Sequence, residues 1–383
     1  MQQHENSIKC IVFFIFILIN LILLTGCDIN MAKKPLTEKL KTLFDNPEKL
    51  STFSKTEPVI VKNRLVKDYN INKQSYSNFQ FTDTDVHGLF IENATMTNAT
   101  FKGGDYAGLF FSDSRLTNVT FENITFSDAV FSSATLVDVT FKNCNIIDSL
   151  FMKTKGKVTF IDSDLDSVDF HEAQAAITLI NSKVHSTFNP RIQTFTNQQP
   201  GASIDMTDTT LNDVKVGGTL THFKATGGEI IDTVIGNKIK TVQFDNVSID
   251  LAMVGSIGDL TVSNSTLTRF AIGEMKINSI TIDDCQPSEL LSLTDGNYAS
   301  LTIQNCAITT FKPWSITANE LYITDSEFQN TIMSDSKINQ LTLKNVTFEN
   351  GKFDNAMAKE SDLSGVKLGG GEFNMAGSNI PLQ

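Results

Sequence analysis

Large apolar side chains recur every five residues through the first half of the chain. The positions, fifteen in all, are Phe81, Val86, Ile91, Met96, Phe101, Tyr106, Phe111, Leu116, Phe121, Phe126, Phe131, Leu136, Phe141, Ile146 and Phe151. A period of five matches neither an α-helix, with about 3.6 residues per turn, nor a β-strand, with a period of about 2. The pattern therefore predicts a repeat architecture in which each unit stacks on its neighbours.

The residue two positions before each of these anchors is mostly small or medium-sized and uncharged, and the other three positions are rich in Thr, Asn, Asp, Ser and Lys. A unit with one large and one small inward side chain forms one flat side of a square coil, while its polar residues turn the corner and face water. The units at 99–103 (ATFKG) and 134–138 (ATLVD) resemble the pentapeptide-repeat family in this pattern. The resemblance implies an all-β fold, a right-handed quadrilateral β-helix with four units per coil.

The five-residue register slips after Phe151, but pairs of the same kind continue. A strong apolar pair recurs about once per coil at Val242/Phe244, Leu260/Val262, Ile280/Ile282, Leu301/Ile303, Leu321/Ile323 and Leu341/Leu343. From Leu260 onward the steps are 20, 21, 20 and 20 residues, and Pro287 is expected to be the anchor that follows Cys285. We therefore assign residues 79–383 to one solenoid, regular over 79–151 and built of coils of about 20 residues after that. With strands roughly 4.8 Å apart, about 14 or 15 coils make a rod on the order of 70 Å long.

The segment 189–201 (NPRIQTFTNQQPG) interrupts the repeat. Its prolines, amides and final glycine are typical of loops. We expect this segment to leave the coil, either as a tolerated insertion at a corner or as a loop that carries function.

Residues 1–26 have the pattern of a secretory signal, with an apolar stretch from Ile11 to Leu24 that is shorter than a membrane span of about 20 residues. The stretch ends in Leu-Thr-Gly-Cys, which resembles the lipobox of bacterial lipoproteins. The resemblance implies cleavage before Cys27, lipidation of Cys27, and stable anchoring by several acyl chains. Asp28 resembles the signal that retains some lipoproteins in the inner membrane. The expected location is the bacterial cell envelope, facing the periplasm, with the inner membrane favoured over the outer membrane or the surface.

Residues 27–78 are expected to combine the lipidated Cys27, a basic tether and an N-terminal cap. The apolar spacing over 35–53 predicts a short helix, or two helices broken at Asn46-Pro47, and 58–66 is typical of a strand. A cap is needed because the end of a β-helix exposes unpaired backbone groups. Residues 28–75 carry ten Lys/Arg and six Asp/Glu; residues 76–383 carry 20 and 36, so the rod has a charge near −16.

No catalytic, cofactor-binding or metal-binding pattern emerges from the polar residues, and we expect no enzyme activity. The five histidines are scattered, and the densest group of acids fits the outward positions of the repeat: Asp162, Asp164, Asp166 and Asp169.

Three cysteines, Cys144, Cys285 and Cys306, fall at the small inward position, where Cys acts as a small hydrophobe. Whether Cys285 and Cys306 form a disulfide stays open, because they lie one coil apart. Trp314 is expected to pack in the core or at a corner, and an aromatic platform for a sugar or a protein is the other interpretation.

These observations predict a non-catalytic, lipid-anchored β-helical rod that binds or scaffolds components of the bacterial envelope. The partner is the membrane at one end and an unidentified protein or polysaccharide elsewhere; oligomeric state and the binding face stay open. A first alternative is an acidic DNA mimic acting on a DNA-binding enzyme, as in the quinolone-resistance pentapeptide proteins. The secretory signal argues against it, and against a nucleic-acid partner, and 361–383 lacks the helix through which those proteins dimerise. A second alternative is a carbohydrate-active β-helix enzyme, for which no catalytic site is evident.

Overall fold

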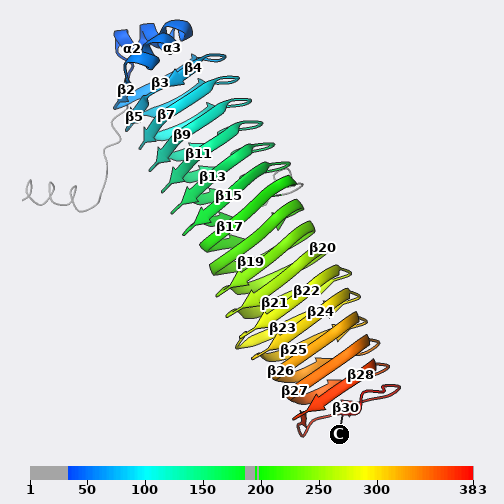
Figure 1. Cartoon of the computed structure of the whole chain (residues 1–383). Coiled ribbons are helices and arrows are strands. Elements are labelled where there is room, and N and C mark those ends of the chain that lie inside the picture. Colours follow the sequence, from blue (N-terminus) through cyan, green and yellow to red (C-terminus); the bar gives the residue numbers. More distant parts are fainter. Residues whose placement is uncertain (1–32, 186–194, 196–197, 383) are drawn as a thin grey trace, which may run out of the picture.

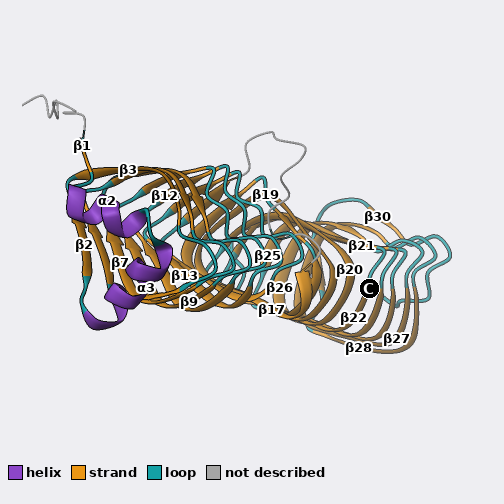
Figure 2. Ribbon diagram, turned by 90° about the horizontal axis from the view of Figure 1, so that it is seen from above, coloured by secondary structure: helices purple, strands orange, loops and turns teal. Residues whose placement is uncertain are grey.

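The computed structural model of the chain describes residues 33–185, 195 and 198–382. Strands make up 67% of the structure and form a β-solenoid of about 15 turns, and the described residues contain two helices (Figure 1). The helices lie together at the N-terminal end of the rod (Figure 2). The predicted all-β solenoid with a short N-terminal cap is confirmed.

The helices are α2 (Glu38–Phe44) and α3 (Pro47–Thr56). The strands before the interruption are β1 (Lys34–Pro35), β2 (Val59–Lys62), β3 (Arg64–Asn70), β4 (Ser75–Ser77), β5 (Phe79–Thr82), β6 (Asp85–Phe90), β7 (Thr95–Lys102), β8 (Asp105–Phe110), β9 (Arg115–Glu122), β10 (Thr125–Ser127), β11 (Thr135–Lys142), β12 (Asn145–Ile147), β13 (Lys155–Ile161), β14 (Asp164–Asp166), β15 (Gln174–Ile180) and β16 (Lys183–His185). The later strands are β17 (Gln198–Asn212), β18 (Lys215–Val216), β19 (Gly218–Asp245), β20 (Ser248–Ser263), β21 (Thr266–Gly273), β22 (Lys276–Asp283), β23 (Ser288–Thr294), β24 (Asn297–Gln304), β25 (Ala307–Trp314), β26 (Thr317–Ile332), β27 (Lys337–Lys352), β28 (Met357–Ser364), β29 (Lys367–Leu368) and β30 (Phe373–Asn374).

Each coil pairs in parallel with the next, so residues one coil apart lie side by side. In the regular region β9 lies between β7 and β11, and Phe121 stands opposite Phe101 and Phe141. The Phe121 ring stacks on Phe101 at 4.9 Å and on Phe141 at 4.8 Å between centroids. All fifteen predicted anchors are buried. The five-residue pattern therefore builds one continuous ladder of stacked side chains along the rod axis.

The polar composition of the repeat has a backbone cause. The residue two positions after an anchor has a left-handed conformation, for example Asn118 with φ 54° and Asn123 with φ 56°. Asn, Asp and Gly tolerate this region better than other residues, which explains their frequency at the corners. The amides also form ladders: Asn118 Nδ2 donates to Asn98 Oδ1 one coil away at 2.8 Å.

The small inward position satisfies backbone groups of the neighbouring coil. Ser114 is buried, and its hydroxyl donates to the Ile91 carbonyl at 2.6 Å and accepts from the Ala94 amide at 3.0 Å. A large apolar side chain here would remove these hydrogen bonds and crowd the packed interior.

The solenoid begins earlier than the predicted boundary at residue 79. Strand β2 pairs with β5, with Val59 opposite Phe79 and Val61 opposite Phe81. Residues 59–78, assigned to the tether and cap, are therefore the first coil. Val61 and the residues that follow it at steps of five are all buried, as a continuation of the anchor series towards the N-terminus: Val66, Ile71 and Tyr76.

Helices α2 and α3 cover the first coil, as the break at Asn46-Pro47 predicts. Phe44 is buried and packs edge-on against Phe79 and Phe81, at 6.4 Å between ring centroids in both cases. Ser54 pairs with the first coil: its carbonyl accepts from the Ser77 hydroxyl at 2.8 Å, and its hydroxyl accepts from the Ser77 amide at 3.2 Å. The helices thus bond to the first coil and bury its apolar end. Neither helix is long and apolar enough to cross a membrane, and this holds for all described residues.

Two details of the predicted repeat are wrong. Pro287 is exposed and is not an anchor; the buried Ser288 takes that position and pairs with Ile308 in the next coil. One extra residue therefore lies at this corner, which accounts for the single step of 21 residues.

The prediction that 189–201 leaves the coil is wrong for the residues of this segment that the structure describes. Residues 189–194 and 196–197 lie outside the described residues. Phe195 is fully buried, stacks on Phe170 at 4.8 Å between centroids, and accepts a hydrogen bond from the Gly217 amide at 2.7 Å. The last four residues of the predicted loop belong to β17. Phe195 and the last four residues of this segment are therefore part of the solenoid wall.

At the C-terminal end of the rod, the side chain of Asn379 hydrogen-bonds to the backbone of the last coil. Asn379 Oδ1 accepts from the Ala358 amide and Asn379 Nδ2 donates to the Ala358 carbonyl, both at 2.8 Å. The side chain occupies the position of a neighbouring strand residue, and Ile380 beside it is buried.

Candidate functional site

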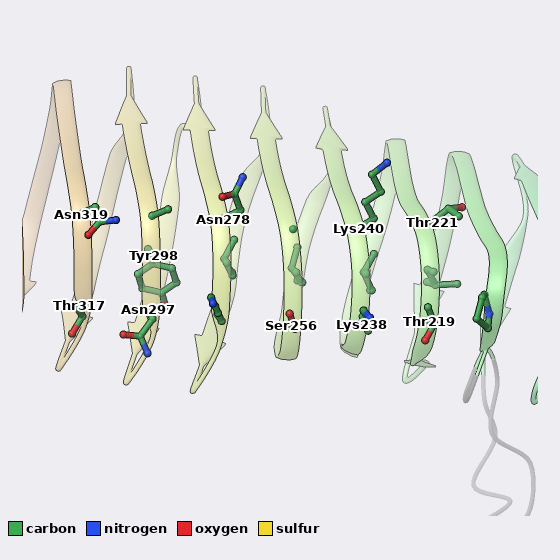
Figure 3. A pocket seen from close by; sticks show the side chains of 18 of the residues that line it. Thr219, Thr221, Lys238, Lys240, Ser256, Asn278, Asn297, Tyr298, Thr317 and Asn319 are labelled. Carbon is green, nitrogen blue, oxygen red and sulfur yellow. The ribbon is translucent and has the colours of Figure 1, made fainter.

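A groove of about 750 Å³ crosses the later coils of the rod. It starts at Pro200 and Gly201 on β17 and reaches Asn319 on β26, so it spans seven successive strand segments and roughly 30 Å at the usual strand spacing. Figure 3 shows the segments side by side, with the groove crossing them. Its direction is along the rod axis, which suits an extended ligand.

Each strand contributes two outward residues that flank one inward residue. One rim of the groove consists of Thr219, Lys238, Ser256, Lys276, Asn297 and Thr317. The other rim consists of Thr221, Lys240, Gly258, Asn278, Ala299 and Asn319. The strand register aligns the first rim coil by coil from Lys238 onward, because Lys238 pairs with Ser256, which pairs with Lys276. Figure 3 shows the labelled members as two rows, with Tyr298 between them.

The charge of the groove is opposite to that of the rod. The lining residues include Lys238, Lys240 and Lys276 and no carboxylate. These three side chains are exposed, and within the described part of the chain none of them forms an ion pair. The rod beyond residue 75 has 36 acidic and 20 basic residues, so this cationic, carboxylate-free surface differs from its surroundings.

One carboxylate beside the groove is already engaged in hydrogen bonds. Asp259 follows Gly258 on β20 and accepts hydrogen bonds from Ser279 Oγ at 2.6 Å and Asn278 Nδ2 at 2.9 Å. These hydrogen bonds, with a smaller contribution from the charge of Lys240, lower the pKa of Asp259. Asp259 therefore stays ionised and orients Asn278 on the rim.

Two residues in the middle of the groove lining, Gly258 and Tyr298, are constrained by close packing. A Cβ atom on Gly258 would collide with the carbonyl oxygen of Lys240, so a side chain does not fit at this position without a backbone shift. Tyr298 lines the groove but is only 3% exposed, and its hydroxyl has no hydrogen-bond partner among the described residues. Burial raises the pKa of Tyr298, so the hydroxyl keeps its proton.

The predicted lipidation residue Cys27 and sorting residue Asp28 lie outside the described residues, as does the whole predicted signal 1–26. Those assignments stay predictions.

The acidic group at 162–169 does not converge on one point. Asp164 Oδ1 lies 2.8 Å from His185 Nε2, and Asp162 accepts a hydrogen bond from Asn181 at 2.7 Å. Asp169 is buried and accepts a hydrogen bond from the His171 amide at 2.8 Å. Burial raises the pKa of Asp169, and the hydrogen bond from His171 partly offsets this. In the part of the chain that the structure describes, no group of three or more His, Cys, Asp or Glu side chains is arranged to hold a metal ion.

Cysteines 144, 285 and 306 are buried and free, so Cys285 and Cys306 do not form a disulfide in this structure. Burial raises the pKa of Cys144 to about 11, although hydrogen bonds from backbone groups lower it in part. A hydrogen bond with Cys285 and burial together raise the pKa of Cys306. All three therefore act as small core residues at the predicted inward position.

Trp314 does not pack in the core. Its side chain is 39% exposed at the end of β25, and Lys312 Nζ lies 5.4 Å from its ring centroid. The adjacent Pro313 is the buried member of the pair. Of the two expected positions, the core is wrong and the corner is right, because Trp314 directly precedes Ser315, whose backbone is left-handed with φ 56°.

The regular coils match a known family. Residues 94–170 match the family model described as the pentapeptide repeat region. No curated protein matches the chain in sequence. Among solved structures, HetL, a pentapeptide repeat protein involved in heterocyst differentiation regulation from the cyanobacterium Nostoc, is 9% identical with a TM-score of 0.22, over 82% of this chain and 90% of HetL. PfbA, a surface adhesin of Streptococcus pneumoniae, is 9% identical with a TM-score of 0.19, over 92% of this chain and 90% of PfbA.

The groove was not predicted from the sequence. The sequence does contain a sign of the groove, because Lys238 and Lys276 lie two coils apart in the same register. The steps from Lys238 to Ser256 and from Ser256 to Lys276 are 18 and 20 residues, so a search at a fixed period does not align them.

Proposed function

We infer that the chain is a non-catalytic binding rod, held in the bacterial cell envelope by a lipid on Cys27. The observation that supports binding most directly is the cationic groove along an otherwise acidic solenoid. The groove lining contains no carboxylate, histidine or cysteine, so its serine, threonine and lysine side chains have no catalytic partner of those three types within the lining.

The membrane part of the proposal rests on the sequence of the first 28 residues. Replacing Cys27 with Ser is expected to abolish labelling by radioactive palmitate and to leave the unprocessed precursor. Cys10→Ser, in the predicted signal, is the matched control and should leave both labelling and processing unchanged. Normal processing of the Cys27→Ser protein would contradict the lipid anchor.

The compartment is tested by protease accessibility of the rod. Digestion after permeabilising the outer membrane, but not in intact cells, is the result expected for a periplasmic binding rod. Digestion in intact cells would place the rod on the surface and favour an adhesive role. Protection until the inner membrane is broken would contradict export. That last result would favour the second candidate, an acidic DNA mimic, whose support is the charge near −16.

A further inference from the structure

We propose that the groove between β17 and β26 binds a linear, weakly anionic glycan with its chain along the rod axis. The inference rests on the proposed role as a binding rod and names the chemical class of its partner.

The cationic side chains of the groove favour an anionic ligand. Lys238, Lys240 and Lys276 are exposed and without carboxylate partners among the described residues. An anion in the groove would gain charge-assisted hydrogen bonds from ammonium groups that form no ion pair among the described residues. It would also avoid the acidic faces on the rest of the rod, which repel the same ligand.

The density of positive charge favours a weakly anionic polymer over a polyphosphate. Lys238 and Lys276 lie two strand spacings apart on one rim, about 10 Å, and the residue between them is the neutral Ser256. The other residues of this rim carry no charge, Lys240 stands alone as the charged residue of the opposite rim, and the rod as a whole is acidic. A polymer with one carboxylate on alternate units matches this spacing. A polymer with a charge on every unit has additional charges that no lysine pairs with, and the acidic rod repels them.

The neutral part of the lining favours a ligand rich in hydroxyl groups. Hydroxyls and carboxamides line both rims at Thr219, Thr221, Ser256, Asn278, Asn297, Thr317 and Asn319. Each of these groups both donates and accepts hydrogen bonds, as sugar hydroxyls do.

The same lining argues against single-stranded nucleic acid. Such ligands bind through aromatic side chains on which successive bases stack, together with a dense basic track. The groove lining has one aromatic residue, Tyr298, which is 3% exposed and so offers no ring face for stacking.

Binding of defined oligosaccharides to the full-length protein in detergent tests the proposal. The probe is a hyaluronan hexasaccharide, which carries a carboxylate on alternate sugars; chitohexaose is the neutral probe and an oligothymidylate the polyphosphate probe. We expect calorimetry to detect hyaluronan binding that weakens with added salt, with weaker binding of the other two. Equal binding of chitohexaose would overturn the role of charge, and tighter binding of the oligothymidylate would overturn the glycan in favour of nucleic acid. No binding of any probe would overturn the proposal.

Variants assign the binding to the groove. Lys238→Gln with Lys276→Gln is expected to weaken hyaluronan binding roughly tenfold or more, which corresponds to about 1.4 kcal/mol. Lys142→Gln with Lys215→Gln removes two exposed lysines that do not line the groove, and it should bind as the unaltered protein does. Unchanged melting shows that each double variant is folded. Equal losses in both would show a non-specific charge effect and overturn the site. Because this assay does not depend on lipidation or location, its failure leaves the Cys27 and protease experiments to test the proposed function separately.

Discussion

At the scale of single residues, the corner positions explain why the repeat is so polar. Asn118 has a left-handed backbone and is hydrogen-bonded to Asn98. We expect Asn118→Val to lower the free energy of unfolding by about 1–2 kcal/mol, because a β-branched residue is strained in this conformation. Asn118→Gly, which removes the same side chain without that strain, should change stability by less than about 1 kcal/mol. Urea denaturation followed by circular dichroism measures both, and equal effects of the two substitutions would mean that the conformation does not limit the choice of residue.

The anchors carry the apolar core. Phe121 is fully buried and stacked between two rings, so Phe121→Ala is expected to destabilise the protein by about 3–5 kcal/mol. The neighbouring Glu122→Ala is the control, because Glu122 points to the surface and pairs with Lys102 at 3.1 Å. An exposed pair of this kind contributes about 1 kcal/mol or less. Similar denaturation curves for the two variants would show that the register is wrong at this coil.

The inward cysteines are predicted to be unreactive. The raised pKa of Cys144 keeps the fraction of thiolate small at neutral pH, and burial keeps reagents away from the sulfur. In a protein with Cys10 and Cys27 replaced by Ser, iodoacetamide should modify no cysteine in native buffer and all three in denaturant, as read by intact mass. Two unmodified cysteines after denaturation without reductant would reveal a disulfide.

At the scale of elements, the solenoid has a different closure at each end. Phe44 joins α2 to the first coil, and in a repeat protein each coil contacts mainly its neighbours. We therefore expect Phe44→Ala to raise hydrogen exchange in α2, α3 and the first coils, and to leave β24 to β27 as protected as before. Thr52→Ala, at an exposed position of α3, is the control. Loss of protection along the whole rod would mean that the solenoid unfolds as one unit.

The elements also show how far sequence reasoning reaches. The anchors over 81–151 and the pairs of the later coils follow from the period of the sequence, and the break between α2 and α3 follows from Asn46-Pro47. The first coil was missed because polar residues, Arg64 and Gln74, stand where the small partner was expected, although the anchors continue. Phe195 and Ser288 were missed because insertions shift the register, and only pairing with the neighbouring coil restores it. The groove depends on that same pairing across coils of unequal length, so its residues are not linked by any period in the sequence.

At the scale of the whole molecule, the length of the groove and the charge of the rod together predict a limit on ligand size. The groove extends roughly 30 Å along the axis, and the rod around it is acidic. An anionic oligomer gains contacts as it lengthens until it fills the groove, and any further units lie outside the groove lining on a rod whose net charge is negative. We expect the affinity for hyaluronan oligomers to rise from the tetrasaccharide upward and then level off once the chain spans the groove. Calorimetry over a length series measures this limit. A variant with Ala299→Glu, which adds a negative charge to one rim, should weaken all lengths, and Thr210→Glu, outside the groove lining, should not. A continued rise in affinity per chain would contradict a bounded groove and indicate that the glycan follows the full length of the solenoid.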